Sequence, residues 1–462
     1  MTRCQNLKLV KIIITTQLVL ASPFLWAEDN LSTAKDLETP DKEVKTDKEA
    51  KTALSGKNDE CNKYNKLLSR AEPVLIPTSV CDTISPSLFG LRESLAEHGF
   101  GFSGYIQPRF TYDLKDQRES TQSYNGQDPT YTGAFEAKIT YDLTRLGMGG
   151  NAQLIAGIQG QASSYKVANP PFFSVTTLAV NQSFKNGQVG LQYGYYNLIR
   201  SYYGMVLGGD SASAALGPTS VIPSQLGLSL FTPTPAITVA LKDSTLTWYN
   251  RASISRSSSP NGFKYDISQN PSGLEFKVKG SGTVFVDEIG YKTPLMAPGK
   301  SVWFRAGGIY NTSNVDNFET GAKSSDNYGG YGAMTLQLTK PNPMSPKGLY
   351  IDTKYDYAPS DRNLFTKNFQ MTAFYISPFE NRPRDMISLG YSKVTYSKEM
   401  VANLAKLGVE AEKDSTAYSL SYAAKLTRGI SLISGLTYQI APTLTPKKDD
   451  ALILQTMLHL SF

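Results

Sequence analysis

Residues 451–462 of the chain read ALILQTMLHLSF, so that large apolar residues recur at nearly every second position. A period of two is the period of a β-strand, in which successive side chains point to opposite faces. One face of this segment is apolar and ends at the terminal Phe462, whereas the other carries Gln455, His459 and Ser461. The segment therefore predicts a closing strand with one apolar face and one polar face.

This period of two begins near residue 101 and returns in many segments down to the C-terminus. In 101–114, Phe102, Ile106 and Phe110 share one face, opposite Gln107 and Arg109. A soluble β-sandwich also alternates. Here the polar faces carry charges, and the apolar faces carry Tyr and Phe near the strand ends, which is typical of the aromatic girdles of outer-membrane barrels. We therefore expect an all-β fold, a transmembrane antiparallel β-barrel over residues 100–462.

The composition agrees with strands that face lipid on one side and water on the other. The 462 residues include 27 Tyr, 20 Phe and 37 Gly, but only 3 Trp, 2 His and 3 Cys. Beyond residue 27, no uncharged apolar run approaches the roughly 18 residues expected of a membrane helix. Strands are thus the expected membrane-crossing elements.

The connections between the predicted strands alternate between short and long. We place 16 strands of about ten residues each after residue 100, as an outer-membrane barrel requires an even number. Short connections fall at 144–150, 185–187, 242–244, 296–300, 340–347, 377–383 and 427–429, and longer ones at 115–129, 163–171, 200–235, 256–282, 312–327, 358–366, 397–414 and 441–449. Short periplasmic turns and longer outer loops form the barrel pattern. A strand at 272–278 would make the count odd and would require 18 strands instead.

The N-terminal region divides into a leader and a polar extension. Three basic residues precede an apolar run that ends at Trp26, so residues 1–27 predict a signal peptide. Residues 28–84 predict a charged, largely disordered periplasmic extension, because 28–60 contain almost no large apolar residues to bury. Within it, Cys61 and Cys81 have a spacing that suits a disulfide in an oxidising compartment.

Residues 85–99 predict a short helix on the periplasmic side of the first strand. Ser85 would cap its N-terminus, and Gly99 would end it. Leu88, Leu91 and Leu95 would share one apolar face. Such a helix could occlude the exit of the barrel or rest beside its rim.

The charge and the rare residues argue against several functional classes. The net charge of +6 is a mild cationic bias without a basic stripe, so nucleic acid is not an expected partner. His98 and His459 form no pattern with a Ser or Cys nucleophile, and no phosphate-binding or dinucleotide fingerprint occurs. Ligand clusters for a metal are also lacking. We therefore predict that the protein is not an enzyme and has neither a cofactor nor a metal site.

Several stretches resemble the OprB family of carbohydrate-selective porins. Residues 88–99 (LFGLRESLAEHG) are similar to the G-L-R-x-x-L-x-x-x-G segment that precedes the first strand of that family. Further similar stretches follow in order at 189–197, at 297–299 leading to 304–310, at 348–350, at 382–385, and at 431–441 followed by 451–462. The usual Trp-Gly before G-L-R is absent, and SGLT at 434–437 replaces a common Pro-Asp-x-Gln. The resemblance implies an outer-membrane porin for carbohydrates, and these departures leave its sugar specificity open.

The strand alternation also predicts which side chains line the pore. A barrel of 16 strands is wide enough for a water-filled lumen, whose selectivity comes from the residues that narrow and charge it. The candidates for lining the pore and contacting the permeant are Arg109, Glu136, Lys138, Tyr249, Arg251, Trp303, Arg305, Asp352 and Lys354. Arginine beside Tyr or Trp would offer hydrogen-bond donors and an aromatic face to a sugar. The alternative is that the charged residues among them are ordinary charges that wet the pore wall, which for any single residue is the more frequent case.

The long connection at 200–234 is the candidate for folding into the pore, because a loop with so many apolar residues should pack on something. An outer lid is the alternative. The functional hypotheses are passive diffusion of carbohydrates, a channel for anions or small organic solutes, and a structural or surface-binding barrel. Outer-membrane lipid and lipopolysaccharide would surround the barrel in the bacterial outer membrane. The sequence leaves open whether three copies assemble.

Overall fold

The computed structural model describes residues 61–71, 79–167, 170–202, 221–295, 297–343 and 345–462. The predicted signal peptide, the extension up to residue 60 and the central part of the 200–234 connection lie outside these ranges. Within the described residues, no helix is long and apolar enough to span a membrane.

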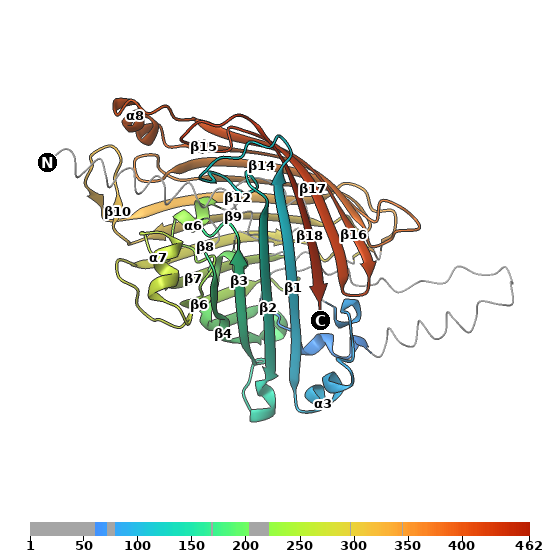
Figure 1. Cartoon of the computed structure of the whole chain (residues 1–462). Coiled ribbons are helices and arrows are strands. Elements are labelled where there is room, and N and C mark those ends of the chain that lie inside the picture. The colour runs from blue at the N-terminus through green and yellow to red at the C-terminus, as the bar shows by residue number, and fades with distance from the viewer. Residues whose placement is uncertain (1–60, 72–78, 168–169, 203–220, 296, 344) are drawn as a thin grey trace.

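Sixteen antiparallel strands of the described chain close into one barrel (Figure 1). They are β1 (Phe100–Asp113), β2 (Thr130–Asp142), β3 (Gln153–Ser163), β4 (Phe172–Phe184), β5 (Val189–Tyr196), β6 (Thr234–Lys242), β7 (Trp248–Arg256), β8 (Thr283–Lys292), β9 (Val302–Asn311), β12 (Asn327–Gln337), β13 (Gly348–Tyr357), β14 (Phe365–Ile376), β15 (Met386–Tyr396), β16 (Asp414–Thr427), β17 (Ile430–Ile440) and β18 (Ala451–Ser461). The predicted barrel and its 16 strands are confirmed. Residues 272–278 lie in a loop, so the 18-strand alternative is wrong.

The ring closes where β1 pairs with β18, in a register that sets Arg109 opposite Met457. The terminal Phe462 continues this pairing. Its N–H and C=O both bond to the backbone of Gly104, each at 2.9 Å. A Cβ on Gly104 would come within 2.6 Å of the Phe462 ring, so this close approach requires glycine.

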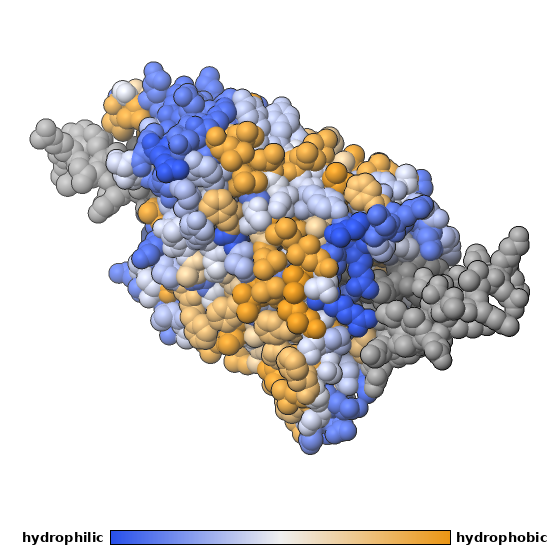
Figure 2. Space-filling view, turned by 45° about the vertical axis from the view of Figure 1, so that its right-hand side comes forward, coloured by the Kyte–Doolittle hydropathy of each residue, from blue (hydrophilic) through white to orange (hydrophobic). Residues whose placement is uncertain are grey.

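The two faces of the barrel wall differ in polarity as the alternation predicts. Apolar side chains such as Ile106, Tyr131 and Leu420 are exposed on the outside. Figure 2 shows hydrophobic residues gathered across the middle of one outer face, with hydrophilic residues concentrated toward its ends. Polar and charged side chains of the opposite parity, such as Gln107 and Glu136, are buried in the interior. The wall therefore turns its hydrophobic side outward, as a membrane barrel requires.

The barrel has a short-turn end and a long-loop end. Residue 100, the C-terminus and the short connections lie at the short-turn end, beside the helix α3 (Leu91–Glu97) (Figure 1). The long connections at the other end contain α7 (Phe263–Gln269), α8 (Lys398–Lys406) and a small hairpin of β10 (Val315–Asp316) and β11 (Lys323–Ser324). The two helices and the hairpin were not predicted from the sequence.

The predicted helix at 85–99 is shorter and differently oriented than expected. Leu88 and Phe89 have φ angles of 48° and 58°, which a right-handed helix does not allow, so α3 begins only at Leu91. Ser85 accepts a hydrogen bond from the N–H of Phe89 instead of capping the helix. The prediction of an apolar packing face is wrong, because Leu91 is exposed and Arg92 is the buried residue of α3. Arg92 donates to the carbonyl of Phe102 and so fastens α3 to the first strand.

The segment before α3 is folded and contains a disulfide between Cys61 and Cys81. Two short helical turns flank the sulfur atoms, η1 (Asn65–Leu67) and η2 (Val80–Asp82). The cysteines pack with Tyr64, Leu68 and Val80 in a buried apolar cluster. This part of the extension, which the sequence analysis assigned to a largely disordered region, is thus held by a covalent bond and a small core of its own.

Candidate functional site: the interior of the barrel

The connection between β5 and β6 turns into the barrel. Its first part forms the short helix α4 (Leu198–Ser201), and its last part contains α6 (Val221–Gln225). Residues 203–220 lie outside the described ranges. Leu198, Ile199, Tyr202 and Leu226 are buried and share one apolar cluster with inward residues of the wall. We refer to residues 198–202 and 221–233 as the inward loop.

An ion pair fixes α4 to the wall of β2. Arg200 donates from Nη1 to both carboxylate oxygens of Glu136, at 2.9 and 3.1 Å. The same carboxylate lies 3.1 Å from Nζ of Lys138 and accepts a hydrogen bond from the hydroxyl of Tyr105 at 2.8 Å. Two cations and a hydroxyl therefore compensate the buried charge of Glu136.

A second attachment holds the same helix to β7. Arg251 donates to the carbonyl of Ser201, and its guanidinium lies 5.9 Å from the ring centre of Tyr202. The hydroxyls of Tyr202 and Ser253 share a hydrogen bond of 2.5 Å. Because β2 and β7 are separated by four strands of the wall, α4 spans part of the interior between them.

The α6 part of the inward loop is attached further around the ring. The side-chain amide of Gln225 donates to the carbonyl of Phe365 at 2.8 Å and accepts from its N–H at 3.0 Å. The amide of Asn311 donates to the carbonyl of Leu226 at 3.0 Å. The inward loop is thus bonded to β2, β7, β9 and the first residue of β14, and it narrows the interior from several sides.

A network of aromatic and charged side chains lines the wall from β7 to β12, centred on Glu288. The carboxylate of Glu288 accepts hydrogen bonds from the hydroxyls of Tyr249 and Tyr331, at 2.8 and 2.7 Å. The indole N–H of Trp303 donates to the hydroxyl of Tyr249 at 3.0 Å. The two phenol groups are therefore held in fixed orientations on the wall.

Cations extend this network toward β13. The Arg305 guanidinium lies 3.8 Å from the ring centre of Trp303, and Nζ of Lys292 lies 4.2 Å from the same ring. Asp352 lies 4.0 Å from Arg305 and 3.6 Å from Lys354. Positive charge thus surrounds the indole, and an attraction of cation and aromatic ring orients Arg305.

The nine residues predicted to line the pore do not form one cluster. Tyr249, Arg251, Trp303, Arg305, Asp352 and Lys354 lie along neighbouring strands from β7 to β13. Glu136 and Lys138 lie on β2 at the other attachment of the inward loop. Arg109 lies apart from both groups on β1, where it contacts the sulfur of Met457.

Several residues that bond to members of these two groups were not predicted from the sequence. Tyr105 and Tyr331 could have been found, because each shares the parity of known inward positions on its strand. Glu288 follows Asp287, so two adjacent acids obscured which of them points inward. Arg200 and Tyr202 could not be placed from sequence, since no strand period applies to a loop.

The interior groups carry more positive than negative charge. Six basic side chains belong to them, Lys138, Arg200, Arg251, Lys292, Arg305 and Lys354, against four acids, Glu136, Glu288, Asp352 and Asp356. Within the described part of the chain, no group of three or more His, Cys, Asp and Glu side chains is placed to hold a metal ion. The arrangement places fixed hydrogen-bond donors and acceptors in the interior of the barrel.

Comparison with known proteins assigns the family. The family model of OprB-type carbohydrate-selective porins matches residues 130–462. This chain belongs to the OprB family of carbohydrate-selective porins. The closed barrel of sixteen strands agrees with this assignment.

Solved structures of OprB from Pseudomonas putida share the fold. The high-pH structure superimposes with a TM-score of 0.67 at 14% identity, over 86% of this chain and 100% of that chain. The low-pH structure gives a TM-score of 0.54, also at 14% identity, over 82% and 98% of the two chains. A protein of Acinetobacter baylyi assigned as a porin, QuiX, is 23% identical over 230 residues. That match covers 46% of this chain and 50% of the Acinetobacter protein.

Proposed function

We propose that this porin lets small carbohydrates diffuse passively through a water-filled barrel that the inward loop and the interior Arg and aromatic residues narrow. The observation that carries the proposal is the attachment of the inward loop to four separated strands. A loop bonded at Glu136, Arg251 and Phe365 has a fixed position and can therefore set the size and the chemistry of the passage.

The wall from β7 to β13 suits a solute rich in hydroxyl groups. Arginine presents several fixed donors to hydroxyl oxygens, and tyrosine hydroxyls both donate and accept. The Arg305 guanidinium already lies over the Trp303 ring. A sugar would therefore meet the guanidinium edge and the phenol groups of Tyr249 and Tyr331 before it met the indole face.

A second candidate is a channel for anions or small organic acids. The excess of interior cations favours it, because a positively charged passage lowers the cost of bringing a carboxylate out of bulk water. An uncharged sugar and a sugar acid of similar size separate the two candidates. The first predicts passage of both solutes, and the second predicts passage of the acid alone.

We further propose that the barrel sits in the bacterial outer membrane, with lipid and lipopolysaccharide on its apolar outer face and the short turns in the periplasm. Short periplasmic turns and longer outer loops are the usual arrangement of such barrels. Assembly of three copies remains a proposal that cross-linking of the protein in membranes would test.

Planar-bilayer recording of the purified mature protein tests the function. A conductance that falls as a neutral sugar is added supports carbohydrate diffusion. Anion selectivity without sugar block supports the second candidate. A protein that inserts but does not conduct is a structural or surface-binding barrel, the third hypothesis, and would contradict both.

A further inference from the structure

The disulfide segment, residues 61–71 and 79–84, contacts the inner side of the barrel wall at the short-turn end. The side chain of Gln153 donates to the carbonyls of Leu67 and Leu68, both at 3.1 Å, and Thr140 also donates to Leu67. Thr140 and Gln153 are buried and have the inward parity of their strands. The polypeptide therefore lies against the lumen side of β2 and β3.

The backbone of the segment lies so close to β1 that only glycine fits beneath it. A Cβ on Gly101 would lie 2.3 Å from the carbonyl oxygen of Leu67. Side chains essentially never approach a backbone oxygen so closely, so this position has to lack a Cβ. The segment can therefore pack against β1 only because residue 101 is a glycine.

The segment also extends inward as far as the inward loop. Ser69 and Ala71 line a small cavity together with Lys138 and Tyr196 of the wall and Ser201 of α4. Ser201 belongs to the inward loop, and Lys138 contacts Glu136, which holds that loop. Residues 69–71 therefore border the same interior space as the proposed constriction.

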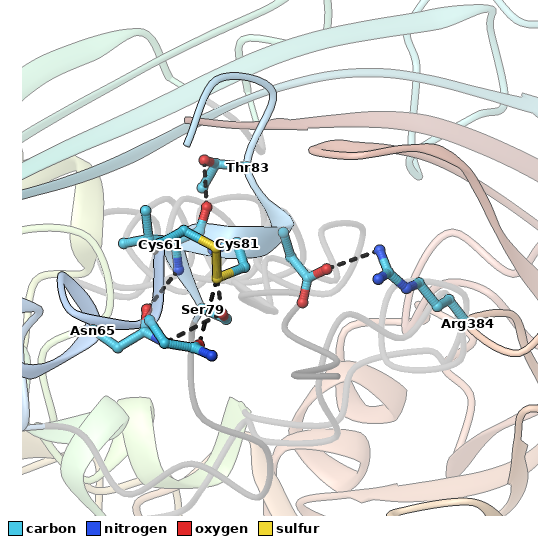
Figure 3. Close-up of a disulfide and its surroundings, with 9 residues drawn as sticks. Cys61, Asn65, Ser79, Cys81, Thr83 and Arg384 are labelled. Carbon is cyan, nitrogen blue, oxygen red and sulfur yellow. Dashed lines mark hydrogen bonds and ion pairs between the residues drawn. A yellow bond between two sulfur atoms is a disulfide. The ribbon is translucent and has the colours of Figure 1, made fainter. Parts of the chain in front are cut away.

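The second part of the segment, residues 79–84, is attached to strands on the other side of β1 along the ring. Asp82 forms an ion pair of 2.9 Å with Arg384 in the turn between β14 and β15, and the N–H of Ile84 donates to the carbonyl of Ser461. Figure 3 shows Arg384 extending from the late strands toward the disulfide segment. Burial raises the pKa of Asp82, while the positive charge of Arg384 acts against this rise.

These attachments extend across half of the ring. The strands from β3 through β2, β1, β18, β17, β16 and β15 to β14 are eight consecutive members of the sixteen. The segment therefore follows the rim along this arc, with contacts to β1 and β18 between its two limits, and its residues 69–71 border the interior. The disulfide joins the part that enters the barrel, which contains Cys61, to the part that is fixed to the rim, which contains Cys81.

We propose that the disulfide segment is a second constriction of the pore at its short-turn, periplasmic end. Solutes leave the inward loop and pass residues 69–71 before they reach the periplasm, so this segment adds its own limit on solute size. The Cys61–Cys81 bond keeps residues 61–71 in the passage, because it ties them to the rim attachment at Asp82 and Ile84. This inference rests on the proposed function as a channel.

Cysteine labelling tests the position of the segment. Ala71→Cys is introduced into the otherwise native, oxidised protein, and single-channel conductance is recorded before and after addition of a positively charged methanethiosulfonate reagent. We expect labelling at residue 71 to remove part of the open-channel current. Lys63→Cys is the matched control, because Lys63 lies on the same segment but is exposed, where it contacts exposed Glu93 and the ring of Tyr64. Labelling at residue 63 should leave the current unchanged.

Reduction tests the role of the disulfide. A thiol-free phosphine reductant should increase the conductance of the wild-type protein and the uptake of larger sugars into liposomes. The Cys61→Ser/Cys81→Ser protein should behave like the reduced wild type and should not respond to the reductant. Mass spectrometry would show how many thiols have been labelled or freed.

The outcomes separate this inference from the proposed function. If the wild-type protein does not conduct at all, the channel proposal fails. If it conducts, and full labelling at residue 71 leaves the current unchanged, the second constriction is refuted while the channel stands. Unchanged conductance after verified reduction would refute the role of the disulfide in holding the segment.

Discussion

Arg200 and Glu136 lie 64 positions apart in the sequence, yet one guanidinium nitrogen of Arg200 bonds to both carboxylate oxygens of Glu136 inside the barrel. The contact joins a loop to a strand three places away along the ring from β5, where the loop begins. The contact holds the start of the connection between β5 and β6 inside the barrel, where an outer lid was the alternative. In the function proposed above, the width of the passage would therefore depend on this charge pair as well as on the strand number.

Replacing Glu136 by glutamine should loosen the inward loop. The substitution removes the anion that Arg200 and Lys138 share, and breaking a buried ion pair in this way costs roughly 3 kcal/mol. We expect larger and noisier single-channel currents and weaker block by sugar. Glu93→Gln, at an exposed position of α3, is the control. Currents of normal size and noise in the Glu136 variant would show that the ion pair does not set the pore width.

Replacing Arg251 by alanine should free the second attachment of α4. Arg251 supplies the hydrogen bond to Ser201 and part of the interior positive charge. We expect altered conductance and a reduced preference for anions in reversal-potential measurements. Asn250→Ala changes the adjacent residue, which bonds to Asp287 from the other face of β7, and should have no such effect. Equal behaviour of the two variants would contradict the assigned role of Arg251.

Two substitutions of Arg305 separate the effect of its positive charge from the effect of its planar guanidinium group. Arg305→Ala removes both the cation beside Asp352 and the planar group over Trp303. Arg305→Lys keeps the charge but not the flat, multidentate donor. We expect the alanine variant to lose anion preference and sugar block, and the lysine variant to lose sugar block alone. Bilayer recordings with a sugar titration measure both properties, and unchanged block in both variants would exclude Arg305 from sugar contact.

The C-terminal residue should matter for assembly. Phe462 forms two backbone hydrogen bonds with Gly104, and its ring lies 5.9 Å from that of Phe102 at the closing seam. Deleting Phe462, or substituting Gly104→Leu, should reduce the amount of inserted barrel. The shift in gel mobility between heated and unheated samples measures the folded fraction. Ser461→Ala is a milder control at the neighbouring position, and wild-type levels of folded barrel in the deletion variant would count against the prediction.

The strand period predicted correctly which wall side chains point outward and which point inward, because lipid and water select the residue type at each position. An apolar side chain at Ile106 and a polar one at Gln107 follow directly from lipid on one side and water on the other. The same rule placed Glu136 and Arg305 in the interior. The helical period failed at Leu91, where a short helix at the rim exposes its leucine and buries Arg92. Outside the membrane, both faces of an element can meet water, so residue type no longer shows which way a side chain points.

By itself, the sequence determined the barrel, its 16 strands and the parity of the wall, because each of these follows from local alternation and loop length. Tertiary structure decided which interior residues meet. The partners of Glu288 lie on β7 and β12, and those of Arg200 and Asp82 lie on strands and turns farther away in the chain. Strand register and loop path bring each pair within bonding distance. Long-range contacts of this kind depend on register and on loop path, which no local period encodes.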